Sequence, residues 1–332
     1  PATQDDAFAK SNEPITDITP DNIADKLSAE LIAGNSYTLT ETAAPAGYEL
    51  ITGSFTFTVN EDGTIEPSSA ENDPAYALGD GITITATDAQ IEIGLIKLGA
   101  DGTKIAGAHF SLASTDDPDK QLGEDIVSTA EGTVNIPNLE VGKTYVLTET
   151  QAPAGYELIS GSFTFKVEDD GTISIPQGAQ NAPAYTRTNK GAVTITVTDT
   201  PVELQIEKRG QDKDGALLSG ATFQIAPAEG TGTTFADGKA DPDPLSFSTA
   251  NGLTEVISQQ LVVGGTYVLT ETAAPAGYKR ITGSLTFTVE DDGSIKEADG
   301  ATNDKAFSID KDNDNGVVIV TAVDEPILIS LE

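Results

Sequence analysis

The sequence contains no cysteine, no methionine and no tryptophan, and it has a single histidine, His109. Without cysteine the chain can form neither disulfides nor zinc ribbons, and it has no thiol nucleophile. One histidine excludes His-based triads and HExxH zinc sites. No run of 18 apolar residues is present, so we predict no membrane-spanning segment, and no signal peptide opens the chain. The missing initiator methionine suggests a piece of a longer protein.

The charge of the chain is strongly unbalanced. Lys and Arg number 18 and Asp and Glu number 53, which gives a formal net charge of −35. A surface this acidic repels nucleic-acid phosphates and anionic lipid, so we expect no nucleic acid and no membrane surface among its partners. Apolar residues still make up 38% of the chain, so a packed core can form. The length of 332 residues fits two or three domains.

A twelve-residue motif, Y-x-L-x-E-T-x-A-P-x-G-Y, occurs three times, and its starts lie 108 and 122 residues apart. Each copy is followed by a strand pattern, G-S-[FL]-T-F-x-V, and then by an Asp-Gly turn typical of a β-hairpin. The copies are Tyr37–Tyr48, Tyr145–Tyr156 and Tyr267–Tyr278. A domain-sized period of this kind predicts three repeats, which we place at residues 1–89, 90–200 and 201–332.

Alternating apolar residues dominate each repeat, so we predict an all-β fold of tandem β-sandwiches, each with about seven short strands. Only Ala89-Gln90 and Thr200-Pro201 separate the repeats, which favours a stiff, rod-like array over freely jointed domains. Two short helices are also expected. One follows the capping sequence Thr19-Pro20-Asp21 and runs toward Leu31, and the other contains Ile257 and Leu261.

Charged residues interrupt the apolar face of three strands in the second repeat. Side chains two residues apart share a strand face, so Lys97, Glu149 and Asp199 are each predicted to point inward with apolar neighbours. The third repeat has the same pattern at Lys208, Glu271 and Asp324. Because the trio occurs twice, we interpret it as a site. The competing interpretations are surface glutamates in twisted strands and strand-ending aspartates that cap a turn.

A buried lysine beside two buried acids has two possible outcomes. The groups can form a hydrogen-bonded ionic cluster, although such clusters seldom add net stability. Alternatively, loss of water lowers the lysine pKa and raises those of the carboxyls, so that a neutral amine faces a protonated acid. The amine can then attack the aspartate carboxyl while the glutamate moves protons, which leaves an amide and one water. Fixed proximity supplies the effective concentration that free groups lack.

Three features resemble CnaB-type (collagen-adhesin B-region, SpyTag/SpyCatcher-like) domains of Gram-positive surface proteins. They are the lysine strand, the twelve-residue motif and a G-A-x-F strand, which occurs at Gly107–Phe110 and Gly220–Phe223. This resemblance implies a transthyretin-like, immunoglobulin-like β-sandwich with a spontaneous isopeptide bond. It further implies that Lys97 and Lys208 are the nucleophiles and Asp199 and Asp324 the acceptors. Glu149 and Glu271 are the implied catalytic acids. Many relatives use Asn as the acceptor and release ammonia, whereas Asp releases water.

The first repeat departs from this pattern. Glu41 and Asp88 occupy the glutamate and aspartate positions, but the strand that carries the lysine is absent. Lys10 and Lys26 are the only lysines before Asp88, and the position of Lys10 matches Leu112 rather than Lys97. We therefore predict no isopeptide bond in residues 1–89 and an open sheet edge beside the two acids. Lys10 shares the strand face of Phe8 and is the candidate substitute for the missing lysine. At the other end, residues 325–332 resemble a first strand that stops one residue before its lysine.

These observations predict a stalk segment of a Gram-positive adhesin or pilus, extracellular and anchored to the cell wall outside this segment. Its partners would be neighbouring domains of the same surface protein. A single cross-linking event per domain does not make a turnover enzyme, and no cofactor or metal is expected, since Asp310–Asp314 lacks the glycine and glutamate positions of a calcium loop. The alternative is an adhesive module that binds a host matrix protein or glycan through the insertion Ala226–Leu253. Few aromatic residues in that insertion favour the stalk.

Overall fold

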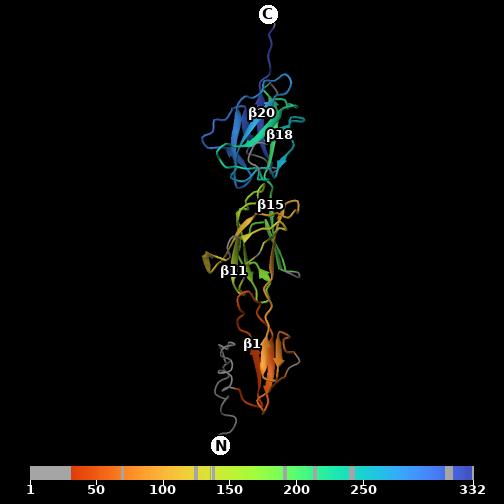
Figure 1. The fold of residues 1–332 in the computed structure, drawn as a ribbon, viewed down its shortest axis with the longest axis vertical. Helices are drawn as coiled ribbons and strands as arrows, with labels where there is room; N and C mark the ends of the chain where they lie inside the picture. Colours follow the sequence, from red (N-terminus) through yellow and green to blue (C-terminus); the bar gives the residue numbers. More distant parts are fainter. Residues whose placement is uncertain are drawn as a thin grey trace. The chain divides into compact units, whose positions relative to one another are not determined.

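The computed structural model describes residues 31–68, 71–122, 126–134, 136, 139–189, 193–211, 215–238, 244–310 and 317–330. These residues form β-strands joined by turns and loops, and none of them is helical (Figure 1). The predicted all-β fold is therefore confirmed. The helix expected after Thr19 lies outside the described residues except for Leu31, as does Lys10. By contacts the chain divides into two compact units, residues 1–91 with 138–142 and 167–172, and the remainder, each described here by itself.

The described part of the first repeat contains a three-stranded and a two-stranded antiparallel sheet. The larger sheet consists of β1 (Ser36–Thr40), β2 (Ser54–Val59) and β3 (Ile65–Pro67). The smaller one pairs β4 (Tyr76–Gly79) with β5 (Thr83–Ala86). Alternate residues of β2 point inward and form a small core with Tyr76, whose ring lies 6.1 Å from that of Phe55.

Two sheets make up the second repeat. Across the first sheet, from one edge to the other, the strands are β10 (Thr133–Val134), β6 (Ile93–Gly99), β15 (Val193–Asp199) and β14 (Tyr185–Thr188). The second sheet contains β13 (Ile173–Ser174), β12 (Ser162–Val167), β11 (Thr144–Gln151), β7 (His109–Ser114) and β8 (Asp117–Gln121), with β9 (Ile126–Val127) also pairing with β7. This exceeds the seven strands expected, because two-residue strands such as β9 and β13 are too short to leave an alternating pattern.

The third repeat has the same arrangement. Its first sheet contains β19 (Ile257–Ser258), β16 (Glu203–Gly210), β24 (Val318–Asp324) and β23 (Phe307–Asp310). Its second sheet contains β18 (Leu245–Ser248), β17 (Thr222–Pro227), β20 (Thr266–Ala273), β21 (Ser284–Val289) and β22 (Ile295–Glu297), and β18 and β20 are labelled in Figure 1.

The helix expected at Ile257 and Leu261 is wrong. Ile257 begins β19 and is paired with Leu204 of β16, and Leu261 lies in the bend before β20. Both side chains are buried in the core of the third repeat. The four-residue spacing resembles that of a helix because both side chains reach the same core from a loop-rich segment. The backbone at Ile257, however, is paired with β16 of the sheet.

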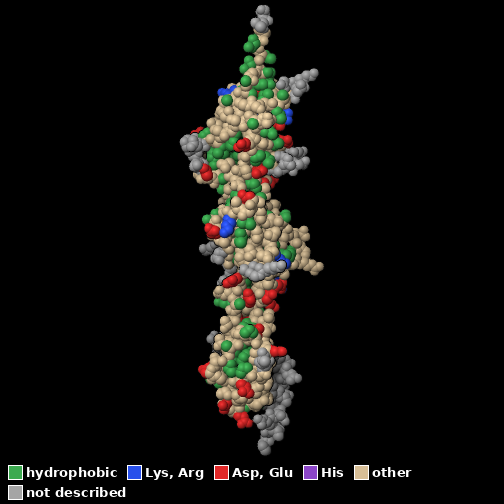
Figure 2. All heavy atoms as spheres, turned by 90° about the vertical axis from the view of Figure 1, so that its right-hand side faces the viewer, with side chains coloured by type: hydrophobic (Ala, Val, Ile, Leu, Met, Phe, Trp, Pro, Cys, Tyr) green, Lys and Arg blue, Asp and Glu red, His purple; other side chains and the backbone are tan. Residues whose placement is uncertain are grey.

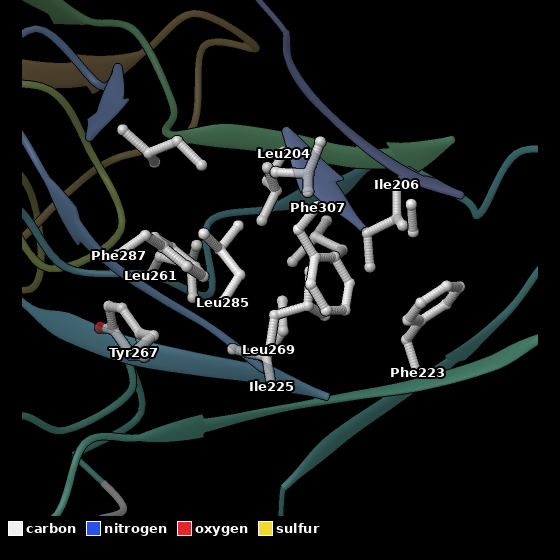
Figure 3. Close-up of a cluster of buried hydrophobic side chains, with 14 of the residues drawn as sticks. Leu204, Ile206, Phe223, Ile225, Leu261, Tyr267, Leu269, Leu285, Phe287 and Phe307 are labelled. Carbon is white, nitrogen blue, oxygen red and sulfur yellow. The ribbon is translucent and has the colours of Figure 1, made fainter. Parts of the chain in front are cut away.

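Side chains from both sheets form the core of the third repeat, as Figure 3 shows for Phe223, Ile225, Tyr267 and Leu269 facing Leu204 and other residues of the opposite sheet. Each of these strands buries every second residue, as the period-two pattern requires. On the outside, Asp and Glu side chains are scattered over the face seen in Figure 2, and Lys and Arg are few. Acidic side chains are therefore frequent on this solvent-exposed face.

A repeated asparagine holds one strand in every repeat. The Asn72 side-chain oxygen accepts a hydrogen bond from the Thr56 backbone N–H at 2.7 Å, and its Nδ2 donates to the Thr56 carbonyl at 3.0 Å. Asn181 binds Thr164 and Asn303 binds Thr286 in the same way. The amide thereby substitutes for the backbone of a neighbouring strand and satisfies both polar groups of the threonine.

Candidate functional site

Parallel strand pairing brings the predicted lysine and aspartate together. β6 and β15 run parallel, with Lys97 opposite Val197 and Asp199 opposite Gly99, so the two charged residues are diagonal neighbours on one sheet face. β16 and β24 are paired in the same register, with Lys208 opposite Ala322. The glutamates come from the facing sheets, on β11 and β20. Three elements distant in sequence thus converge at one point of each sandwich.

In the second repeat the three side chains are in contact and fully enclosed. Lys97 Nζ lies 2.8 Å from Glu149 Oε1 and in direct contact with Asp199 Oδ1. The exposed fraction of each residue is 3% or less. The burial removes the interpretation of Glu149 as a surface residue and of Asp199 as a solvent-exposed turn cap.

The third repeat contains the same cluster. Lys208 Nζ lies 3.0 Å from Glu271 Oε1 and in direct contact with Asp324 Oδ1, and all three side chains are buried. The other oxygen of each aspartate, Oδ2, is buried and has no hydrogen-bond partner among the described residues in either repeat. Each aspartate therefore presents one oxygen to the amine and leaves the other one unbound.

A backbone amide that sequence reasoning missed holds each glutamate in place. Ile159 N–H donates to Glu149 Oε2 at 3.0 Å, and Ile281 N–H donates to Glu271 Oε2 at 2.7 Å. The donor follows the glutamate by ten residues in both repeats and also in the first, where Ile51 binds Glu41. That constant spacing is a signal in the sequence, although a backbone donor leaves no side-chain signature.

The repeats differ at a second contact to the glutamate. In the second repeat the Glu149 backbone N–H donates to the Tyr185 hydroxyl at 3.1 Å. Phe307 occupies the corresponding strand position in the third repeat, where Arg280 Nη1 instead donates to the Glu271 carbonyl at 3.0 Å. The glutamate side chain keeps the same position in both cases, so the tyrosine hydroxyl is not required for this geometry.

The surroundings of the cluster disfavour charge. Burial raises the pKa of Asp199 to about 7, against the opposing effect of Lys97, and the Glu149 carboxyl raises it further. Burial also raises the pKa of Glu271. One lysine faces two acids, so full ionisation would leave a net negative charge in an apolar core, next to the Phe110 ring 5.7 Å from Lys97 Nζ. A protonated carboxyl beside the amine is therefore favoured.

The first repeat contains the two acids without a described lysine. Glu41 Oε2 accepts a hydrogen bond from Ile51 N–H at 2.7 Å, and the Glu41 N–H donates to Tyr76 at 3.1 Å, as at Glu149. Burial raises the pKa of Glu41, and the Asp88 carboxyl, which is hydrogen-bonded to it, raises that pKa further. Both lysines that precede Asp88 lie outside the described residues, so the substitution by Lys10 stays a prediction.

Replacing Glu41 by glutamine is expected to stabilise the first repeat at neutral and higher pH. Because the folded state raises the Glu41 pKa above 4.5, its contribution to stability is present at low pH and lost as the pH rises through the raised value. Glutamine does not ionise and can still accept the Ile51 hydrogen bond. Calorimetry should show a higher melting temperature for the variant at about pH 8 and no such gain at about pH 4; an equal gain at both pH values would contradict the account.

Among the described residues, no group of three or more His, Cys, Asp or Glu side chains is arranged to hold a metal ion. The same part of the chain contains no helix long and apolar enough to cross a membrane.

Each repeat contains two sheets, and the second and third repeats each contain a buried Lys–Glu–Asp trio. These features define a tandem prealbumin-like protein. The family model described as the SpaA prealbumin-like fold domain matches residues 9–73, 91–181 and 202–305. Since these segments cover more than half of the chain, it belongs to the SpaA prealbumin-like domain family and carries three copies of the domain. The exact borders at residues 89 and 200 stay predictions.

Solved structures that match this chain include several pilus proteins. The C-terminal fragment of the pilus adhesin SpaC from Lactobacillus rhamnosus GG is 19% identical, with 74% of this chain and 100% of that chain covered and a TM-score of 0.40. A streptococcal ancillary pilin is 18% identical (89% and 77% covered, TM-score 0.29). A mutant form of the shaft pilin SpaA from L. rhamnosus GG is 16% identical (72% and 99% covered, TM-score 0.30). No curated protein matches the chain.

Proposed function

We propose that this chain is a stalk segment of a Gram-positive surface fibre, either a pilus or an adhesin, and that CnaB-type isopeptide bonds lock its second and third repeats. The bonds join Lys97 to Asp199 and Lys208 to Asp324. The observation that carries the proposal is the fully buried Lys–Glu–Asp trio, repeated with the same register and the same glutamate contact. A buried ionic cluster alone offers little net stability, so its repetition favours a chemical role.

The reaction needs only the groups already in contact. Neutral Lys97 Nζ attacks Cγ of protonated Asp199, a C–N bond forms, and the C–OH bond breaks to release one water. Glu149 accepts a proton from the nitrogen and donates one to the departing hydroxyl, so its own protonation state is unchanged.

Removal of charge from the core drives the reaction forward. Before the reaction, an amine and two carboxyl groups lie in an apolar environment, and afterwards a neutral amide replaces the amine and one carboxyl. The enclosed geometry supplies the proximity, since the reacting groups are held in contact by two paired strands. Each repeat reacts once within itself, so the chain is a structural protein in this proposal and not a turnover enzyme.

The cross-links suit a chain that bears tension. Each bond joins a first strand to a last strand, 102 residues apart in the second repeat and 116 in the third. Force applied along the chain then passes through the amide and bypasses the residues between. A chain without cysteine obtains in this way a covalent lock that reducing agents do not break.

The alternative adhesive role receives less support from the insertion in the third repeat. Phe235, the aromatic residue in its described loop, is buried and stacks on Tyr267 with ring centroids 5.7 Å apart. β18, at the end of the insertion, extends the sheet by pairing with β17. Phe247 of β18 is partly buried and packs against the same core. The described insertion therefore contributes its aromatic residues to the core and the sheet rather than to an exposed anchor for a partner.

Stretching single molecules by their ends tests the stalk function. The intact chain should show no unfolding step from the second or third repeat, because the bonds prevent the residues between them from being extended. These segments span 102 and 116 residues, or roughly 350 and 400 Å of contour length. The Lys97→Met variant should regain the shorter step only. Steps of both lengths in the unmodified chain would contradict the proposal.

A further inference from the structure

In the second and third repeats, the lysine strand ends at a glycine that lies beside the aspartate of the trio. Gly210 follows Lys208 by two residues and is paired with Asp324 across the parallel strands β16 and β24. Gly99 has the same position in the second repeat and is paired with Asp199. Residues two apart on a strand share a face, so a side chain at either glycine would point into the sandwich next to the aspartate. The glycines leave that space open to another part of the chain.

The last tyrosine of the twelve-residue motif occupies this space. A Cβ atom at Gly210 would lie 2.9 Å from both Cε1 and the hydroxyl oxygen of Tyr278, and one at Gly99 would lie 3.1 Å from the hydroxyl oxygen of Tyr156. Because Cβ atoms in proteins essentially never come within 3.0 Å of such an atom, an alanine at Gly210 would displace the Tyr278 ring. Burial raises the pKa of Tyr156, and the nearby Asp199 carboxyl raises it further. In both repeats the tyrosine thus fills the position beside the aspartate.

Backbone hydrogen bonds connect the residue after each tyrosine to the residue after each aspartate. In the third repeat, Lys279 N–H donates to the Glu325 carbonyl at 2.8 Å. In the second repeat, Glu157 N–H donates to the Thr200 carbonyl at 2.9 Å. The tyrosine ring and the end of the aspartate strand are therefore fixed relative to each other in both repeats.

We propose that Tyr156 and Tyr278 are positioning residues of the cross-linking reaction: each ring fills the space over a strand glycine, keeps water from the neighbouring aspartate carboxyl and holds that carboxyl toward the lysine amine. This inference rests on the proposed function, because it concerns the same reaction. Exclusion of water disfavours the charged forms of the amine and the acid, so the reactive neutral pair gains. A carboxyl that cannot turn away keeps its carbon within reach of the amine.

The rate of bond formation in the full chain, made by cell-free synthesis, tests the inference. Samples are quenched in denaturant at intervals, and peptide mapping measures each branched peptide separately, so the second repeat is an internal standard for variants of the third. Tyr278→Ala should slow the bond between Lys208 and Asp324 roughly 10–100-fold, because small misplacements of reacting groups have effects of that size. Tyr278→Phe should form it at the rate of the unaltered chain, because phenylalanine keeps the ring.

Gly210→Ala tests the same contact without deleting a side chain. It should slow the bond of the third repeat by a similar factor, because the added Cβ displaces the Tyr278 ring. In the Tyr278→Ala background it should have no further effect, since the ring is already gone. Gly94→Ala on β6 is the control, because a Cβ there would meet its nearest neighbour at 3.6 Å. This change should leave the bond of the second repeat at its normal rate.

The same measurements separate this inference from the proposed function. If Tyr278→Ala is folded, as judged by protease digestion, and forms its bond at the rate of the unaltered chain, the inference is wrong and the proposed function stands. It is also wrong if Tyr278→Phe is as slow as Tyr278→Ala, or if Gly210→Ala slows the bond equally with and without the ring. If Tyr278→Ala does not fold, a normal rate in Gly210→Ala overturns the inference. If the unaltered chain forms neither bond, both proposals fail.

Discussion

Replacing Glu149 by glutamine is expected to leave the second repeat folded but without its bond between Lys97 and Asp199. Glutamine has nearly the same volume and its amide oxygen can still accept the hydrogen bond from Ile159 N–H. It cannot carry a proton from the lysine nitrogen to the leaving hydroxyl, a role that typically contributes ~10²–10⁴-fold to a rate. Intact mass after purification should show that only the bond of the third repeat has formed.

Glu271→Gln is the matched variant in the third repeat, where Ile281 provides the same contact. It should remove the bond between Lys208 and Asp324 and leave that of the second repeat intact. Circular dichroism should report unchanged sheet content for both variants. If either variant forms its bond at the rate of the unaltered chain, the glutamate is only structural and the proton-transfer role is wrong.

Replacing Lys97 by methionine should cause a large loss of stability confined to the second repeat. Methionine fills the buried space but cannot form the bond that links residues 102 apart in sequence. By analogy with a disulfide that closes a loop of this size, the chain-entropy model gives about 5 kcal/mol. Urea unfolding can be followed by a signal from Tyr145 or Tyr185, which lie in the core of the second repeat. Together with protease digestion, it should show that the second repeat of the variant unfolds at a lower urea concentration than that of the unaltered chain.

Lys143→Met is the control for that experiment. Lys143 is also bonded to an acid, Asp116, at 2.7 Å, but the pair is exposed. Such surface pairs contribute roughly 0–1 kcal/mol. A stability loss from Lys97→Met no larger than that from Lys143→Met would show that no covalent lock is present in the second repeat.

Strand periodicity predicted the burial of charge, because the sequence of each strand carries its own inside–outside pattern. Ile93, Leu95 and Lys97 are each two residues apart and therefore share one face of the strand. Lys97 is 0% exposed in the structure. The pattern does not specify which strand lies beside which. The parallel pairing of β6 with β15, which sets the lysine against its aspartate, depends on contacts between residues about 100 apart.

Other parts of the site lack a signal of this type. The Ile159 amide that fixes Glu149 is a backbone group, and any residue except proline supplies it. The asparagines that hold Thr56, Thr164 and Thr286 occur at a constant place in every repeat, but short polar residues in loops usually indicate turns. The incorrect helix prediction at Ile257 has the opposite cause. A helical spacing of two apolar residues also results when one residue of a short strand and one residue of the following bend reach the same core.

The intact mass of the purified chain tests the central claim most directly. Each bond between a lysine and an aspartate removes one water, so the account predicts a mass two waters below that of the sequence, with branched peptides joining Lys97 to Asp199 and Lys208 to Asp324. The first repeat contributes no loss. A mass equal to that of the unmodified sequence would contradict the account.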